Sequence, residues 1–487
     1  MGVDGPAWSA VGLGAGAGKY PLAVEQPVMA QAAQLVPGVT TVTPHARYFA
    51  IHGMVMAEAQ ARGLDKDATK DLLRRTEVAA AAVSFVHHGG HDSPTGRAHG
   101  TDSLAQRLRG GTLVMEEASA VGGYARNSWG FSGAYLGSEV TLGVLDQTRG
   151  PGETYDDVAV RGGIGRLLDL AREDELTLSD LAQDTGLCIC AGPGRPDGRW
   201  LARLLCGKDE RIAEDEATLS RRETIRLLAR IVDTHDIRNL TEQVTDILAF
   251  GVFLSTDTVA AASPVAHRWR GVTLRNHAVS AWRRLWAWLV DQVVDVTHID
   301  DVVAALLAEL PAGTVGAWLS ELPPTTGPDG APAPAEVSLY DGYGAPAADL
   351  RVLCANAARV SELTGEIRKV FAGSPDHELT PAWLAANLDA QRSHSLHAFA
   401  DRLVRQLLAR SERVALMKTR RKADGTLWFP GRVRSLDGGW LYKTGAEGRG
   451  RVSLRLAQLG NVLVGSGVFA DVGGRITVTA LGRDLLV

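Results

Sequence analysis

The sequence is poor in cysteine and in lysine, and it has no long uninterrupted hydrophobic run. Its four cysteines are too few for a disulfide framework; they are Cys188, Cys190, Cys206 and Cys354. The N-terminus lacks a basic stretch followed by an apolar one, so no secretory signal is predicted. The most apolar helical stretch, 282–296, is interrupted by charged residues and is expected not to span a bilayer. These absences predict a soluble, cytoplasmic protein without a membrane partner.

Helical periodicity dominates the first two-thirds of the chain. Thr43-Pro44 has the pattern of a helix N-cap, and Tyr48, Ile51 and Val55 then share one face of a helix over 45–61. Further helices are expected at 66–86, 104–109, 163–171, 218–232, 241–250, 277–296, 348–371, 393–416 and directly after Thr380-Pro381. Few alternating runs indicate strands in this part, so the fold class is expected to be mainly α.

At 487 residues the chain is too long for one compact core, which predicts several domains. A Pro-rich stretch at 321–349 has the composition of a linker or a long surface loop, and the main boundary is expected there. The predicted parts are a Gly/Ala-rich segment 1–40, a large helical domain 41–320, the connector 321–349 and a basic C-terminal domain 350–487. A helix over 452–464, a glycine-bearing turn and a strand over 475–479 suggest that this last α/β domain ends in a winged helix.

Positive charge is concentrated near the C-terminus. Residues 402–455 contain fourteen Arg or Lys and four Asp or Glu, a net charge of +10, whereas the whole chain has a net charge of −5. The remainder therefore has a net charge of −15. An asymmetry of this size indicates an interaction surface, and the phosphate backbone of a nucleic acid is the obvious partner. An acidic protein partner, or the acidic N-terminal part of the same chain, is the alternative.

The residues expected to contact phosphate lie within this basic stretch. They are Arg420, Arg421, Lys422, Arg449, Arg451 and Arg455, with Lys418 and Arg434 nearby. Four aromatic residues are interleaved with them: Trp428, Phe429, Trp440 and Tyr442. Such rings stack on unpaired bases in proteins that bind single strands, but they also form the cores of small sheets. The core role is the expectation for most of the four.

The stretch V-H-H-G-G-H-D-S-P has the residue types of a metal site. His87, His88, His91 and Asp92 offer imidazole and carboxylate ligands suited to zinc or iron. However, consecutive residues on a helix point about 100° apart, and helical ligand pairs are usually three or four residues apart. The expectation is a polar helix end with exposed histidines, and a divalent metal is the alternative to having no cofactor.

Two weaker patterns remain. Cys188-x-Cys190 with Cys206 resembles part of a thiolate metal cluster, but a second Cys pair is missing, so buried free thiols are expected. The His-Asp doublets at 91–92 and 235–236 resemble those of HD-type metal phosphohydrolases, where His52 and Asp146 would have to complete the site. The stretch G-L-G-A-G-A-G-K-Y near the N-terminus fails the phosphate-loop patterns, and a flexible tail is expected instead.

One resemblance to known proteins bears on function. The run L-V-P-G-V-T-T-V-T-P-H-A-R-Y-F-A at 35–50, followed by L-L-R-R-T-E-V at 72–78, resembles the start of poorly characterised bacterial proteins encoded in anti-phage defence clusters. A similar S-H-S-L-H helix begins near Ser393. The resemblance covers roughly the first hundred residues and brings no catalytic residues with it. It implies a genomic context of helicases and nucleases.

Together these features predict a non-catalytic subunit that binds DNA or RNA, or acts as a scaffold, in a bacterial complex of the defence type. A partner ATPase or nuclease would then perform the chemistry. The alternative is a metal-dependent phosphohydrolase or nuclease that uses the cluster from His87 to Asp92.

Overall fold

The computed structural model describes residues 21–89, 98–339, 345–421 and 424–486. The protein is mainly α, as predicted, with helices α1 to α24 and a few short strands among these residues. The chain divides into two compact units. Unit 1 contains residues up to Ala32 and from Thr245 to Leu454, and unit 2 contains Ala33–Val244 and Arg455–Val487. No helix within the described ranges combines the length and apolar character needed to cross a membrane.

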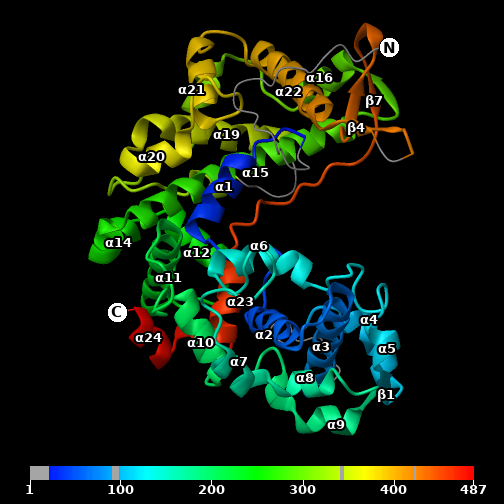
Figure 1. Ribbon diagram of the computed structural model, residues 1–487. Coiled ribbons are helices and arrows are strands. Elements are labelled where there is room, and N and C mark those ends of the chain that lie inside the picture. The colour runs from blue at the N-terminus through cyan, green and yellow to red at the C-terminus, as the bar shows by residue number, and fades with distance from the viewer. Residues whose placement is uncertain (1–20, 90–97, 340–344, 422–423, 487) are drawn as a thin grey trace. The chain divides into compact units, whose positions relative to one another are not determined.

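Unit 2 is built around α2 and α3, and α3 contacts α2, α4, α5, α8 and α9 (Figure 1). Its helices are α2 (Arg47–Arg62), α3 (Lys66–His87), α4 (Thr101–Arg109), α5 (Met115–Ser119), α6 (Ser132–Leu142), α7 (Asp157–Ile164), α8 (Arg166–Leu170), α9 (Leu178–Gln183), α10 (Pro196–Leu205), α11 (Glu216–Thr234), α23 (Leu456–Ser466), α24 (Ala480–Leu486) and the short η1 (Thr185–Leu187). Its strands are β1 (Thr112–Val114) and β2 (Glu175–Thr177), which pair with each other, and β8 (Phe469–Val472) and β9 (Arg475–Val478), which form a second antiparallel pair.

The two central helices follow their sequence patterns. The predicted face of α2 is buried, with Tyr48, Ile51 and Val55 fully enclosed. Helix α3 begins where the Asp65 side chain accepts hydrogen bonds from the backbone N–H groups of two following residues, which satisfies donors that a helix start leaves unpaired. The predicted cap of α2 is wrong: Thr43 instead accepts a hydrogen bond from the Thr40 N–H in a local turn, so the helix begins later, at Arg47.

The segment Arg455–Val487 belongs to unit 2 and not to a separate C-terminal domain. It forms α23, the hairpin β8–β9 and α24 in that order. Helix α23 contacts α10, and β9 contacts α11, so this segment packs on helices far away in the sequence. A helix followed by a hairpin is the local order that the sequence predicts. A winged-helix fold stays a prediction.

Unit 1 is organised around the long helix α15 (Pro264–Gln292), which packs against α19 and α20 (Figure 1). Trp282, Leu285 and Leu289, which are spaced to share one face of α15, are buried. The other helices are α13 (Phe253–Thr256), α14 (Thr258–Ala262), α16 (Ile299–Ala308), α17 (Val315–Ser320), α18 (Ala335–Ser338), α19 (Pro346–Glu362), α20 (Gly365–Ala372), α21 (Pro381–Ala390) and α22 (Leu396–Lys418). The unit boundaries near residues 32 and 244 fall inside α1 (Gln26–Leu35) and α12 (Glu242–Ala249).

The Pro-rich connector lies inside unit 1 and does not separate the two units. Its short helix α18 carries Glu336, which is fully buried and accepts hydrogen bonds of 2.6 Å from both Nε and Nη2 of Arg359 on α19. A buried ion pair of this kind holds the connector against the helical core, which a composition-based prediction does not capture. The helix predicted over 348–371 is in fact two helices, because the backbone becomes extended at Leu363, whose side chain packs in the core beside Phe371.

Two small sheets complete unit 1. The three-stranded sheet has the order β3-β7-β6, with β3 (Val296–His298), β6 (Val433–Ser435) and β7 (Trp440–Lys443) all antiparallel to their neighbours. The two-stranded sheet pairs β4 (Arg420–Arg421) with β5 (Leu427–Trp428). The part of the basic stretch that follows α22 therefore forms strands, and β7 within it pairs with β3 from an earlier part of unit 1.

Candidate nucleic-acid interface and candidate metal centre

One face of the three-stranded sheet exposes two large aromatic side chains. Along β7 the residues alternate, so Leu441 is buried while Trp440 and Tyr442 are 47% and 46% exposed. Val433 on β6 is buried on the same side as Leu441. The prediction that most of the interleaved aromatics form a sheet core is therefore wrong for Trp440 and Tyr442, because the aliphatic residues between them fill the core.

Basic and imidazole groups flank these rings. Arg434 on β6 lies directly opposite Tyr442 and is exposed. On the other side of β7, the His298 ring meets the Trp440 ring edge-on, with 5.2 Å between centroids. We call the surface formed by Arg434, Tyr442, Trp440 and His298 the aromatic sheet face. Its flat rings and adjacent cation are the combination that contacts unpaired bases together with phosphate.

The two remaining aromatics are half-buried beneath arginines. The guanidinium of Arg420 lies 5.0 Å from the ring centre of Trp428, and that of Arg434 lies 5.4 Å from the ring centre of Phe429. Both distances fall within the range of cation–π contacts. These contacts hold the arginines over apolar surface while their outer faces stay accessible.

The residues predicted to contact phosphate do not all share one surface. Arg420, Arg421, Arg434, Arg449 and Arg451 are exposed in unit 1. Arg449 also forms an ion pair of 2.8 Å with Asp291. Lys422 lies outside the described residues.

Lys418 and Arg455 are placed differently from the exposed arginines. Lys418 is half-buried at the end of α22, and burial lowers its pKa. Arg455 belongs to unit 2, where it precedes α23 with a left-handed φ of 65° and donates a hydrogen bond of 2.8 Å to the Val39 carbonyl. Its guanidinium therefore supports the local fold of unit 2.

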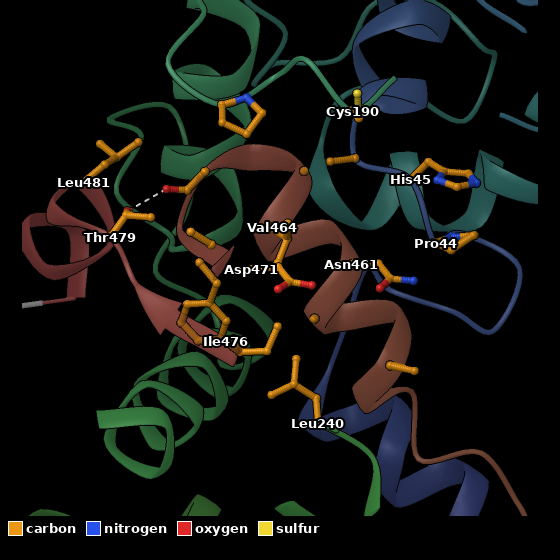
Figure 2. A pocket seen from close by; sticks show the side chains of 18 of the residues that line it. Pro44, His45, Cys190, Leu240, Asn461, Val464, Asp471, Ile476, Thr479 and Leu481 are labelled. Atoms are coloured by element: carbon orange, nitrogen blue, oxygen red, sulfur yellow. Dashed lines mark hydrogen bonds between the residues drawn. The ribbon is translucent and has the colours of Figure 1, made fainter. Parts of the chain in front are cut away.

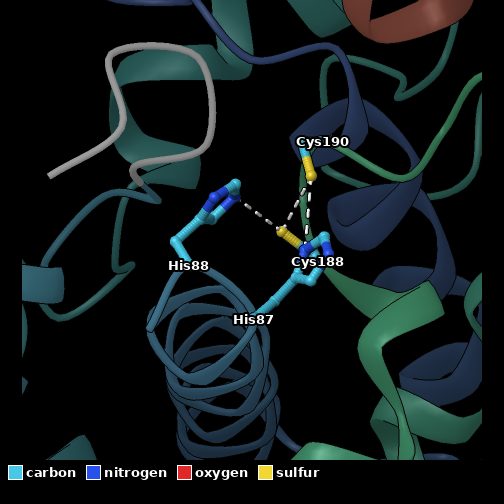
Figure 3. Close-up of side chains that lie close together, drawn as sticks. All are labelled: His87, His88, Cys188 and Cys190. Atoms are coloured by element: carbon cyan, nitrogen blue, oxygen red, sulfur yellow. Dashed lines mark hydrogen bonds between the residues drawn. The ribbon is translucent and has the colours of Figure 1, made fainter. Parts of the chain in front are cut away.

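A second site in unit 2 joins two motifs that the sequence analysis treated separately. One ligand atom from each of His87, His88, Cys188 and Cys190 lies within 4.8 Å of all the others (Figure 3). We call this set the His–Cys cluster. Cys188 Sγ is 3.5 Å from His88 Nε2, and Cys190 Sγ is 3.5 Å from His87 Nδ1. The two sulfur atoms are 3.2 Å apart.

The end of α3 explains how neighbouring histidines converge. His87 is the last helical residue, whereas His88 has a ψ of 15° and Gly89 a left-handed φ of 62°. The backbone therefore leaves the helix at the second histidine, and the rings come to 4.8 Å between centroids. The objection drawn from regular helix geometry does not apply at this terminus.

The loop with the two cysteines is held from both sides. Ser84 on α3 accepts a hydrogen bond of 3.2 Å from the Ile189 N–H, between the cysteines. The buried Arg47 on α2 donates to the carbonyls of Gly186 and Cys188, and it is paired with the buried Asp197 at 2.7 Å. The hydrogen bond between the two sulfurs lowers the pKa of Cys188 and raises the pKa of Cys190.

The other proposed metal ligands do not join this cluster. His91 and Asp92 lie outside the described residues. Cys206 is buried at the end of α10 and is not one of the four ligand residues. The pairing of His87-His88 with Cys188-x-Cys190 was missed because each half alone is an incomplete ligand set.

His52, proposed for an HD-type site, has a different setting. It is fully buried, and its two ring nitrogens contact Glu139 through Nδ1 and Glu77 through Nε2, the latter at 2.9 Å. Burial alone would lower the pKa of His52, but the charges and hydrogen bonds of the two glutamates raise it to about 9. The raised pKa favours the imidazolium form, in which both ring nitrogens donate to the glutamates. Asp146 accepts hydrogen bonds from the backbone of its own turn.

A cavity of about 1100 Å³ lies next to the cysteine loop in unit 2 (Figure 2). Cys190, His45, Asn461 on α23 and Asp471 on β8 are among the residues that line it. One sulfur of the His–Cys cluster is therefore also part of a cavity wall.

No protein-family model, no curated protein and no solved structure matches this chain. The resemblance to proteins of defence clusters accordingly stays a prediction.

Proposed function

We propose that the protein binds single-stranded nucleic acid through the aromatic sheet face of unit 1. The observation that carries the proposal is the exposure of Trp440 and Tyr442 on one strand, next to exposed arginines. Large aromatic rings are usually more stable when they are buried. Two such rings that are about half exposed on one small face therefore indicate a surface that binds a partner. Stacking of bases on the rings and pairing of arginines with phosphate would both be satisfied there.

Arg434 supports the proposal through its position. It faces Tyr442 across the strand pair while it also covers Phe429, so its charge lies at the edge of the stacking surface. The hairpin β4–β5 adds Arg420 and Arg421, both exposed. The phosphates of a single strand could pair with these arginines while its bases stack on the aromatic rings of β7. The partner ATPase or nuclease of a defence-type complex is part of the same proposal and rests on the sequence resemblance alone.

The phosphohydrolase alternative gains less support. Hydrolytic sites of that class use imidazole and carboxylate ligands with an open metal position. The described partners of His87 and His88 are two cysteines, which complete a set of four protein donors. Such a closed set suits a structural metal.

The test is binding of the full-length protein to labelled single-stranded DNA, single-stranded RNA and duplex DNA, measured by fluorescence anisotropy. The double variant Trp440→Ala/Tyr442→Ala should lose about 1–3 kcal/mol of binding free energy for each stacked base. Trp129→Ala is the matched control, because Trp129 lies beneath an arginine, 4.3 Å from the guanidinium of Arg149, in unit 2. Equal affinity of the wild type and the double variant, or binding to duplex alone, contradicts the proposal. Binding only to an acidic protein would also contradict it.

A further inference from the structure

We propose that His87, His88, Cys188 and Cys190 bind one zinc ion, which acts as a structural metal in unit 2. Two thiolates and two imidazoles are a donor set that zinc prefers, and structural zinc sites are closed by four protein ligands in a tetrahedron. The four donor atoms already lie within 4.8 Å of one another. Any proton still held by the sulfurs passes to solvent when the metal binds.

The two sulfur–nitrogen distances in the cluster match those around a tetrahedral zinc ion. Zinc–sulfur and zinc–nitrogen bonds of roughly 2.3 and 2.0–2.1 Å place a sulfur and a nitrogen about 3.6 Å apart at the tetrahedral angle. The two sulfur–nitrogen pairs are each 3.5 Å apart. The sulfur atoms, at 3.2 Å, need to separate by about half an ångström to reach the roughly 3.8 Å of two zinc-bound thiolates.

A disulfide fits the same atoms less well. Its sulfurs are bonded at about 2.05 Å, so the pair would have to close by more than 1 Å. The two cysteines are also separated by a single residue whose N–H is held by Ser84, which opposes rearrangement of the loop. A disulfide would moreover leave both histidines, which face the sulfurs in Figure 3, without a role.

The supporting contacts are those of a prepared site. Arg47 donates a hydrogen bond to the Cys188 carbonyl and forms an ion pair with Asp197. The Ser84 hydroxyl accepts a hydrogen bond from the N–H of Ile189, between the two cysteines. The ion would link His88 and Cys188, which are 100 positions apart in the sequence. It would thereby fasten the cysteine loop to the end of α3 and fix the cavity wall that Cys190 contributes.

The experiment is metal analysis of the full-length protein, purified under reducing conditions and dialysed with zinc. We expect one zinc per chain, and X-ray absorption should show two sulfur and two nitrogen donors. Cobalt in place of zinc should give a thiolate-to-metal charge-transfer band and the strong visible bands of a tetrahedral ion. Removal of the metal by a chelator should lower the melting temperature.

Two ligand variants and two controls make the assignment specific. His87→Ala and Cys190→Ser should each lower zinc affinity by more than about a hundredfold, because loss of an outer-shell contact alone lowers it 10- to 100-fold. His87 is exposed, so its variant is expected to keep the wild-type circular dichroism even if the cysteine variant does not. Cys354→Ala and His394→Ala, both in unit 1, should bind zinc like the wild type.

Three results would overturn the proposal. The first is protein that binds no zinc after this treatment. The second is zinc that His87→Ala retains with wild-type affinity. The third is a Cys188–Cys190 disulfide, found by mass spectrometry in protein that was never exposed to an oxidant.

Discussion

Arg434 and Tyr442 lie directly opposite each other on neighbouring strands, one supplying a cation and the other a half-exposed ring. Proteins that bind single strands stack bases on aromatic rings and pair cations with phosphates, and this residue pair offers both kinds of contact. The two contributions can be measured separately, because the contribution of the arginine to binding depends on salt concentration and that of the ring does not.

The salt dependence of binding should therefore fall when Arg434 is neutralised. Each phosphate contact on a single strand contributes roughly 0.7 to the slope of log affinity against log salt concentration. Arg434→Gln should reduce that slope by about this amount, whereas Trp440→Ala should weaken binding with the slope unchanged. Arg483→Gln is the control, since this exposed arginine lies in unit 2 and pairs with Asp233. Identical slopes for wild type and Arg434→Gln would mean that Arg434 makes no contact with phosphate.

The buried His52 should make unit 2 less stable at alkaline pH. Its pKa is raised to about 9 in the folded protein from an ordinary value near 6.5. A raised pKa means that the folded state holds the proton more tightly, so this contribution is fully present below pH 6.5 and is lost as pH rises through 9. Its size is about 3 kcal/mol. Thermal melts between pH 6 and pH 9.5 should show the decline.

His52→Gln provides the comparison for that measurement. Glutamine cannot carry the charge, so the variant should be less stable than wild type at pH 6 and the difference should shrink toward pH 9.5. A constant difference across this range would mean that His52 is neutral when buried. Removal of the cation also leaves Glu77 and Glu139 buried without a charged partner, which is destabilising by about 3–5 kcal/mol in comparable cases.

The connector should behave as part of unit 1 and not as a cleavable linker. Glu336→Ala leaves the buried guanidinium of Arg359 without its carboxylate and should destabilise unit 1 by about 3–5 kcal/mol. Limited proteolysis tests this directly: wild-type protein should resist cleavage at 325–338, and the variant should be cut there first. Glu321→Ala is the control, because that glutamate makes only a partly exposed pair with Arg351. Rapid cleavage of the wild type at 325–338 would restore the linker interpretation.

Local patterns predicted the helices well, because caps and apolar stripes are short-range features. The buried face of α2 follows from spacing alone, whereas the helix expected over 277–296 in fact spans Pro264–Gln292 as α15. For the aromatics Trp440 and Tyr442, the alternation of side chains along a strand leaves two possible buried faces. Local sequence does not say which face is buried, since that depends on the elements packed beneath the sheet, so the core role expected for these aromatics was wrong.

The site residues show the same limit more strongly. His87-His88 and Cys188-x-Cys190 each lack half of a ligand set, and a single sequence gives no way to pair segments 100 residues apart. The division into units could not be predicted either, because the segment from Arg455 onward returns to pack on α10 and α11. Composition alone predicted that the Pro-rich stretch is a linker or a long surface loop. No local pattern reveals that Glu336 in this stretch forms a buried ion pair with Arg359.

The most direct test of nucleic-acid binding at the aromatic sheet face is hydrogen–deuterium exchange of the full-length protein, with and without a saturating single-stranded oligonucleotide. The account predicts that peptides covering 433–443 and 420–428 become protected, while peptides from α15 exchange as before. Unchanged exchange across 433–443, with protection confined to other segments of a saturated complex, would contradict it.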